Sequence, residues 1–230
     1  QTFFTDKQKE KVKQGFCEGD LVHRLGDPFE WSEANITPSL DANVYLGKPS
    51  LWMFSTLYYE YYNTPKILRN KNFESLRKKQ YKSLQKFFDK HFYFKSPKNY
   101  QKYLKCMTET NVQDYLVINP YLKKKQIKVI DLGPGLGRHF SWVNTFYKDS
   151  VYYGVDIALF SYLNQKAFFQ TFDVKVHDLI EYVQFGLSKK SIKGSKNEVW
   201  QVPTWHLNKI DDTVDLITAS FMLNELNTVG

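Results

Sequence analysis

Cysteine is scarce in this sequence, since Cys17 and Cys106 are the only two among 230 residues. Two cysteines so far apart form neither a disulfide framework nor the paired spacing of a zinc site, so we expect no metal and a reducing, cytoplasmic setting. No apolar run approaches the ~18 residues that a membrane span requires, and the N-terminus is too polar for a signal peptide. The sequence therefore predicts no membrane span.

Acidic residues are outnumbered by basic ones, which gives a formal net charge of +8 at pH 7. A chain with 42% hydrophobic and 24% charged residues is typical of soluble globular proteins, although its 17% aromatic content is high. The positive charge favours acidic partners such as nucleic acid, phosphorylated sugars or anionic membrane surfaces. Charge alone does not choose among these partners.

The segment Val129–His139 joins an apolar, β-branched run to a loop with regularly spaced glycines and then to an amphipathic stretch. This order predicts a strand, a tight turn and the start of a helix. Bare backbone in such a loop can approach a ligand where a Cβ would collide, and the helix N-terminus directs its amides toward that ligand. Nucleotide-like cofactors bind at such loops, and a glycine turn without a ligand is the alternative interpretation.

The spacing of the glycines indicates which cofactor to expect. The dinucleotide pattern G-x-G-x-x-G requires glycine at position 138, which is Arg138, whereas the third glycine is Gly137. The resulting pattern D-x-G-x-G-x-G, with Asp131, Gly133 and Gly135 before Gly137, resembles the first motif of class I S-adenosylmethionine-dependent methyltransferases. This resemblance implies S-adenosyl-L-methionine as the cofactor and these four residues as part of its binding site.

A second acidic residue, Asp156, ends the strand-like segment Val151–Asp156, about 20 residues beyond the glycine loop. A carboxylate there can accept hydrogen bonds from two ribose hydroxyls at once. This geometry suits both NAD and S-adenosylmethionine, so Asp156 supports an adenosine cofactor without naming it. Capping of the following helix is the structural alternative for this residue.

The chain divides near residue 122, where helical periodicity gives way to alternating strand and helix patterns. We expect an aromatic-rich helical region at 1–122, a cap or lid on the acceptor side, and an S-adenosylmethionine-binding domain at 123–230. The second region is expected to be α/β, a Rossmann-like doubly wound parallel sheet. The expected strands are 127–132, 151–156, 198–202 and 214–219, with helices at 138–147 and 158–172 and a lysine-rich helical insertion at about 175–196.

A complete methyltransferase core of this kind has seven strands, so about four of them are expected here. The last of these would leave an unpaired sheet edge. We therefore expect a C-terminally truncated domain, poorly soluble without the rest of its sequence.

Apolar spacing and cap residues predict several helices in the first region. Aromatic side chains of the Trp52–Tyr62 segment are expected to form core, with a sugar-stacking lid as the alternative. The expected helices are 5–16, 51–62, 73–91, one beginning at Ser96–Pro97 and extending past Met107, and a further short one at about 111–118.

Further cofactor contacts are expected after the third and fourth expected strands. The third runs into Thr204 and Trp205, where methyltransferases place residues around the adenine, so Trp205 is a candidate for stacking on the base and Thr204 for bonding its edge. Both residues are equally compatible with ordinary packing. The loop after the fourth strand faces the reactive methyl in this family, which makes Ser220 a candidate cofactor contact.

Methyl transfer to an alcohol benefits from a base, because the pKa of the hydroxyl lies far above 7. The candidate catalytic residues are Glu225, with Asn224 beside it at the acceptor side, and the two histidines His206 and His139. Each has a structural alternative, an exposed helix residue for the glutamate and a packed imidazole for the histidines. No Asp/His cluster has convincing metal-ligand spacing.

Enzymes that methylate nucleobase amines commonly carry an Asn- or Asp-Pro-Pro-aromatic signature after the fourth strand, and it is absent from residues 220–223. The aromatic helical region, together with the motifs at 131–139, 203–205 and 219–226, resembles the sugar O-methyltransferases of bacterial surface-polysaccharide gene clusters. This resemblance implies a sugar-hydroxyl acceptor on a glycan or on a nucleotide- or lipid-linked precursor. Two alternatives remain: a nucleic-acid methyltransferase using basic segments such as Lys123–Lys125, and a non-catalytic subunit.

Overall fold

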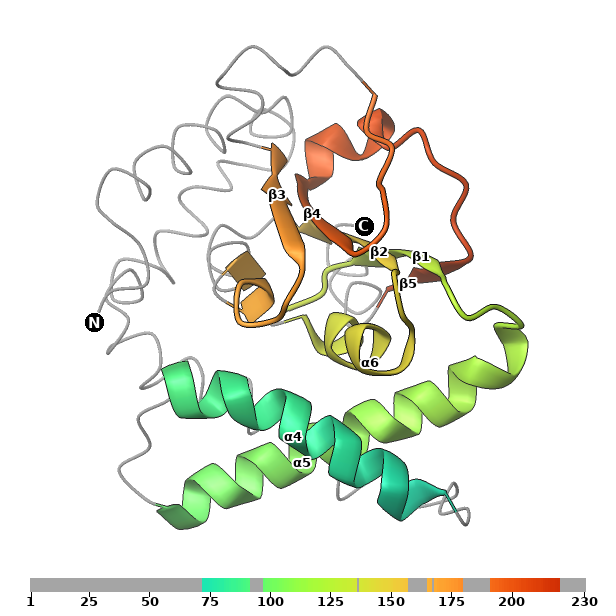
Figure 1. Cartoon of the computed structure of the whole chain (residues 1–230). Coiled ribbons are helices and arrows are strands. Elements are labelled where there is room, and N and C mark those ends of the chain that lie inside the picture. Colours follow the sequence, from blue (N-terminus) through green and yellow to red (C-terminus); the bar gives the residue numbers. More distant parts are fainter. Residues whose placement is uncertain are drawn as a thin grey trace, which may run out of the picture.

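The computed structural model describes residues 72–91, 97–135, 137–156, 165–166, 168–179 and 191–219. Within these ranges the chain is an α/β protein in which helices pack on an all-parallel five-stranded sheet. The α/β class expected from the sequence is therefore confirmed. Figure 1 shows α4 and α5 crossing below α6, which lies between them and the sheet. The helices expected at 5–16 and 51–62 lie outside the described residues.

The strands follow the order β3-β4-β2-β1-β5 across the sheet. Parallel pairing sets Leu132 of β1 opposite Val155 of β2, and Asp156 of β2 opposite Pro203 of β4. On the other side of β1, Asp131 lies opposite Thr218 of β5. The strands are β1 (Lys128–Leu132), β2 (Val151–Asp156), β3 (Lys175–Asp178), β4 (Glu198–Pro203) and β5 (Leu216–Thr218).

About four strands were expected, and the sheet has a fifth because β3 pairs with β4 at its outer edge. Its four residues begin the segment that the sequence indicated as a helical insertion. Val176 is the one aliphatic residue in this strand, so hydrophobic periodicity gives no strand signal there. Hydrogen bonding to β4 stabilises this strand although its own sequence has little strand propensity, so tertiary structure overrides the local preference.

The described helices are α4 (Phe73–His91), α5 (Pro97–Ile118) and α6 (Arg138–Phe146), with short 3-10 turns η2 (Asn119–Tyr121) and η4 (Thr204–Lys209). α5 is continuous, so the separate helix expected at 111–118 was wrong. In its polar middle, the buried hydroxyls of Thr108 and Thr110 donate to the carbonyls of Leu104 and Cys106, one turn back, so these side chains are satisfied within the helix.

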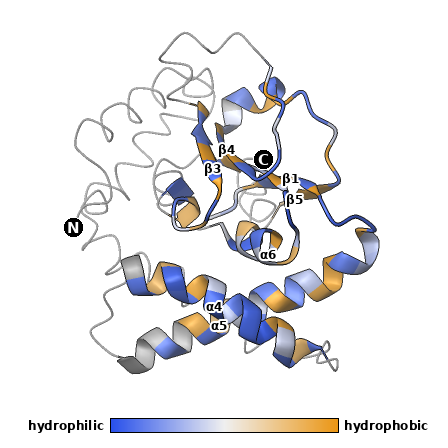
Figure 2. Ribbon diagram, viewed as in Figure 1, coloured by the Kyte–Doolittle hydropathy of each residue, from blue (hydrophilic) through white to orange (hydrophobic). Residues whose placement is uncertain are grey.

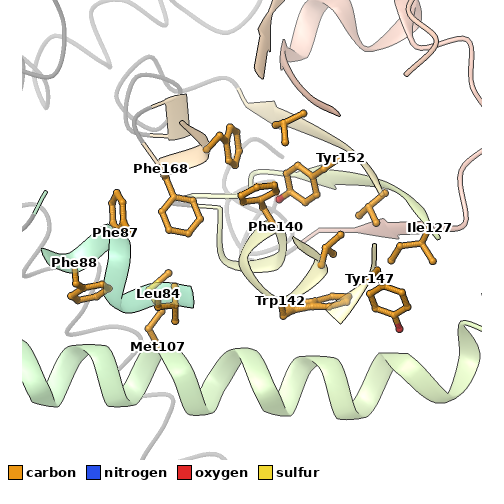
Figure 3. Close-up of a cluster of buried hydrophobic side chains, with 14 of the residues drawn as sticks. Leu84, Phe87, Phe88, Met107, Ile127, Phe140, Trp142, Tyr147, Tyr152 and Phe168 are labelled. Carbon is orange, nitrogen blue, oxygen red and sulfur yellow. The ribbon is translucent and has the colours of Figure 1, made fainter. Parts of the chain in front are cut away.

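One hydrophobic core joins α4, α5 and α6 to a face of the sheet. Figure 3 shows Phe140 of α6 between Tyr152 of β2 and Phe168, with ring centroids 5.3 and 6.0 Å away. α4 contributes Leu84, Phe87 and Phe88 to the same core. The helices before residue 122 and the sheet after it therefore share one core. Figure 2 shows the matching alternation of hydrophobic and hydrophilic residues along α4 and α5.

The opposite face of the sheet is covered by a second, smaller cluster. Successive strand residues point to opposite faces, so Tyr153 and Val155 belong to this cluster although Tyr152 belongs to the first. Leu179, Ile192 and the partly buried Ile210 cover this side. All six residues of β2 are buried as a result, which is typical of a central parallel strand.

The amino end of the sheet is held by lysine–carboxylate pairs. Lys128 binds both oxygens of Asp212 at 2.6 and 2.8 Å, and the hydroxyl of Tyr153 donates to Asp212 at 2.7 Å. Lys124 binds Asp215 at 2.5 Å, and this carboxylate also accepts the backbone N–H of Lys128. The acidic turn before β5 therefore fastens the start of β5 to the start of β1.

Within the described ranges, none of the helices combines the length and apolar character that crossing a membrane requires.

Candidate cofactor site at the carboxyl end of the sheet

The predicted site residues lie where β1, β2, β4 and β5 end. The chain leaves β1 for β2 on one side and returns later to β5 on the other, so a change of direction falls between β1 and β5. In open parallel sheets, ligands bind outside the carboxyl ends of the strands at such a point. The topology therefore brings the segments after Leu132, Asp156, Pro203 and Thr218 to one edge of the sheet.

The glycine loop follows β1 and turns into α6. Gly133, Gly135 and Gly137 have φ values of 65°, 58° and 82°, a region that residues with a Cβ rarely adopt. The backbone N–H of Gly133 donates to the carbonyl of Val155 at 2.8 Å, which fixes the loop to the end of β2. The three glycines singled out from the sequence are thus required by the backbone conformation of the loop.

Gly137 is also required by packing. It is the N-cap of α6, and a Cβ on it would lie 2.8 Å from the ring of Phe168 and 2.9 Å from that of Phe169. Side chains essentially never tolerate such contacts, so a bare backbone lets α6 approach the 168–169 segment. Packing therefore explains the absence of a side chain at position 137, independently of any ligand.

Asp131 lies at the end of β1 with no exposed surface. Its Oδ1 accepts the hydroxyl of Thr218 at 2.7 Å and lies 3.2 Å from Nδ1 of His139, while its Oδ2 accepts the hydroxyl of Tyr152. Burial and this carboxylate raise the pKa of the Tyr152 phenol well above its usual value. In this arrangement the carboxylate fastens β1, β2, β5 and α6 together beneath the loop.

His139, a candidate catalytic residue, is buried between two carboxylates. Its Nδ1 faces Asp131, and its Nε2 lies 3.8 Å from Oδ2 of Asp114 on α5. Burial by itself lowers the pKa of the imidazole, but Asp131 and Asp114 outweigh burial and raise it above the usual value. Arg138 binds the same Asp114 through two nitrogens, both at 2.7 Å. These contacts dock α5 onto the start of α6.

Asp156 is buried at the end of β2, and Gln165 links it to the glycine loop. Nε2 of Gln165 donates to Oδ2 of Asp156 at 2.7 Å and to the carbonyl of Gly135 at 2.9 Å. The loop and the proposed ribose carboxylate are therefore held by one side-chain nitrogen. The structure brings these two sequence-predicted elements together.

The remaining predicted residues lie along or beyond η4. Thr204 directly follows Pro203, which pairs with Asp156, so its backbone lies at the same edge. Trp205 and His206 continue η4; the side chain of His206 is partly exposed, and that of Trp205 lies outside the described atoms. Ser220, Asn224 and Glu225 lie outside the described residues. All three stay predictions that rest on the sequence alone.

Sequence reasoning missed Gln165, Asp114, Tyr152 and Thr218. The period of a strand carries a signal for Tyr152, because residues two and four apart share a face and Asp156 lies four positions later. Thr218 becomes visible only when β5 is set in register with β1. Gln165 and Asp114 reach the site through tertiary packing, and no local pattern marks them.

A groove of about 300 Å³ lies between the beginning of α4 and the end of α5. Its wall includes Tyr115, whose ring packs on Phe146 at the last residue of α6, 4.2 Å between centroids. The glycine loop is at the opposite end of α6. This groove is therefore separate from the candidate cofactor site.

Among the described residues, no group of three His, Cys, Asp or Glu side chains gathers as metal ligands would. No protein-family model matches the chain, and no curated protein or solved structure is significantly similar to it.

Proposed function

We propose that this chain is an S-adenosylmethionine-dependent methyltransferase with a Rossmann-like core. The observation that carries the proposal is the loop of three left-handed glycines after β1, bonded through one side chain to the carboxylate that ends β2. The order β4-β2-β1-β5 agrees with the 3-2-1-4 order of Rossmann folds, with β3 added outside β4. A bare backbone beside a strand-end carboxylate suits an adenosyl group with its ribose diol.

S-adenosylmethionine would supply a methyl group on a sulfonium centre, and transfer to a nucleophile is an in-line displacement that depends mainly on positioning. The chain's part is to hold the adenosyl group with the loop backbone at Gly133 and Gly135 and with Asp156. Thr204 and Trp205, beside the end of β2, are the candidates for the adenine. Ser220 stays a candidate from the sequence.

For the acceptor we propose a sugar hydroxyl, on a cytoplasmic glycan precursor that is nucleotide- or lipid-linked. Removing the proton of a hydroxyl needs a base. Both ring nitrogens of the buried His139 face carboxylates, those of Asp131 and Asp114, so this histidine is poorly placed to act as that base. His206, partly exposed in η4 near the end of β2, and Glu225 are the better candidates. Within the basic segment 123–125, Lys124 is paired with Asp215, so at least this lysine has a role in the fold.

Calorimetry of the full chain with S-adenosylhomocysteine tests the cofactor. Asp156→Ala removes a carboxylate that would accept two ribose hydroxyls, and we expect Kd to rise by roughly 100-fold or more, since each such bond contributes about 1.5–3 kcal/mol. Gly135→Val, which places a β-branched residue at φ 58°, should abolish measurable binding. The matched control is Asp173→Ala, at an exposed position, which should bind as the unaltered chain does.

Unchanged affinity in both variants would refute the assignment of the site, and no binding by the unaltered chain would refute the proposal itself. Labelled methyl transfer then compares nucleotide sugars with RNA as acceptors. RNA binding that survives ~0.3 M salt would favour the nucleic-acid alternative, because counterion release weakens phosphate contacts steeply. Binding of S-adenosylhomocysteine with no transfer to any acceptor would favour the non-catalytic subunit.

A further inference from the structure

Gln165 belongs to no motif that the sequence displays, yet its side chain lies between the two elements of the proposed cofactor site. We propose that Gln165 is a positioning residue that fixes the Asp156 carboxylate against the glycine loop, an inference that rests on the proposed function. It is fully buried, with no exposed surface. It acts through Asp156 and Gly135 and has no chemical step of its own.

The orientation of this amide follows from hydrogen-bond chemistry. Oδ2 of Asp156 and the carbonyl of Gly135 are both acceptors, at 2.7 and 2.9 Å from Nε2. An amide NH₂ group has two hydrogens, so this one nitrogen satisfies both acceptors at once. Rotating the amide would set its oxygen against a carboxylate and a carbonyl. Position 165 therefore demands two donated hydrogens from one atom.

The other atom of the amide supplies an independent argument. Oε1 of Gln165 is buried and, among the described residues, has no hydrogen-bond partner. A buried acceptor without a partner is unfavourable, and an apolar side chain of the same length would avoid it. Packing alone does not explain a glutamine here, whereas the bridge made by its nitrogen does.

The neighbouring strand leaves room for this side chain. A Cβ on Gly154 of β2 would lie 3.4 Å from Oε1 of Gln165, at van der Waals contact. The amide thus lies over a bare position of β2, two residues before Asp156, between the strand and the 165–169 segment. Both bonded partners are distant in sequence, 30 residues for Gly135 and 9 for Asp156. Tertiary structure alone brings the three together.

Positioning has a defined consequence for ligand binding. A carboxylate that is already fixed loses little freedom when ribose hydroxyls donate to it, so the fixed geometry favours affinity. Without the amide, Asp156 loses the bond that ties its Oδ2 to the loop, and the ligand must then supply that part of the restraint. We therefore expect substitutions at Gln165 to weaken cofactor affinity while the core of the sheet stays folded.

The test is calorimetry of the full chain with S-adenosylhomocysteine. Gln165→Glu keeps the size but replaces the NH₂ group by oxygen, so a carboxylate faces Asp156 and the Gly135 carbonyl. We expect Kd to rise about tenfold or more, the effect of losing a hydrogen bond to a charged group. The matched control is Gln170→Glu, the same chemical change at an exposed position of the next turn, which should leave Kd within about twofold.

A pH profile distinguishes positioning from a merely structural role. As pH falls toward 5, the carboxyl introduced at position 165 gains a proton and can donate to Asp156, so the affinity of Gln165→Glu should recover relative to the control. A loss of packing alone would show no such recovery. Gln165→Met, which removes the bridge without adding charge, is the second variant should Gln165→Glu fail to fold, and it should weaken affinity at every pH.

Two failures can be told apart. If the unaltered chain binds S-adenosylhomocysteine and both Gln165 variants bind within twofold of Gln170→Glu, this inference is overturned and the proposed function stands. If the unaltered chain does not bind, the proposed function is overturned and the inference with it.

Discussion

At the amino end of the sheet, Asp212 and Asp215 are bonded to Lys128 and Lys124, whereas at the carboxyl end Asp131 and Asp156 are held by hydroxyl, imidazole and amide groups. Lysine neutralises the carboxylate that it binds. Hydroxyl and amide groups orient a carboxylate without cancelling its charge. Aspartate side chains at the two ends of the sheet are therefore bound by different kinds of groups.

This difference indicates a division of tasks. The amino-end pairs join the starts of β1 and β5, which serves the fold. At the carboxyl end, Gln165 holds the Asp156 carboxylate in a fixed direction beside the glycine loop, where the ribose hydroxyls of a nucleotide-like ligand would donate to it. β3 departs from this pattern, because Asp178 at its carboxyl end binds Lys166 at 2.9 Å. That strand lies at the outer edge of the sheet, away from the loop.

The largest loss of stability is expected from a change at Gly137, because this residue belongs to the glycine loop and also packs against the core. In Gly137→Ala the new methyl would lie 2.8–2.9 Å from the rings of Phe168 and Phe169, at a φ of 82°. We expect a loss of about 3 kcal/mol in unfolding free energy, from overpacking and left-handed strain together. Urea denaturation measures it.

The control for this change is Gly154→Ala. Its new methyl would meet its neighbours at 3.4–3.5 Å with no left-handed φ, and a cost of about 1 kcal/mol or less is expected. Equal stability of the two variants would show that the loop backbone is not constrained by α6 and the 168–169 segment.

The second prediction concerns the amino end. Asp212→Ala leaves Lys128 and the Tyr153 hydroxyl without their carboxylate, which is 3% exposed where the lysine is 29% exposed. Breaking a buried pair costs about 3–5 kcal/mol, and the partial exposure of the lysine reduces this to about 2 kcal/mol. Affinity for S-adenosylhomocysteine should not change. Asp211→Ala, next to it and exposed, is the matched control.

The loss of unfolding free energy in Asp212→Ala should depend on pH. Burial raises the pKa of Asp212, but hydrogen bonds from Lys128 and Tyr153 outweigh burial and lower it below the usual value of 3.8. A lowered folded-state pKa gives stability that is present above 3.8 and is lost as pH falls through the folded pKa. The gap between Asp212→Ala and the unaltered chain should therefore narrow below about pH 4. A gap that persists in strong acid would contradict the ion-pair explanation.

The parts that the sequence predicts well are those whose cause is local. β2 was expected at Val151–Asp156 and observed there, because a short apolar run between the polar turn at 148–150 and an acidic end needs no partner to be recognised. The glycines were singled out for their spacing, and their positive φ values give the physical reason. In contrast, β3 depends on its pairing with β4, which no local pattern reveals.

Within the site, the sequence predicts residues but not their partners. Asp131 and Asp156 were both expected to meet the cofactor; Asp131 proves to be engaged by Tyr152, Thr218 and His139. Such contacts join residues more than 80 positions apart in the case of Thr218, and only the sheet register brings them together. A side chain that acts through another residue, as we propose for Gln165, belongs to no local motif and is not predicted from the sequence.

The smallest expected loss of stability concerns His139, and its size depends on pH. Its folded-state pKa is raised above 6.5 by Asp131 and Asp114 against the opposing effect of burial. A raised histidine pKa gives stability that is fully present below 6.5 and is lost as pH rises through the folded value. His139→Gln, which keeps one donor, should therefore cost about 1 kcal/mol near pH 6 and less near pH 9, measured by urea denaturation.

His177 provides a contrast of opposite sign in the same molecule. Burial lowers its pKa below 6.5 despite Glu198, whose Oε1 lies 3.2 Å from Nε2, and its neutral ring stacks on Trp200 at 4.0 Å. A lowered histidine pKa means that stability falls as pH drops below 6.5, so the loss in His177→Gln should be largest in alkali and shrink in acid. Parallel pH profiles for the two variants would contradict the buried, carboxylate-bound state of His139 on which its supporting role depends.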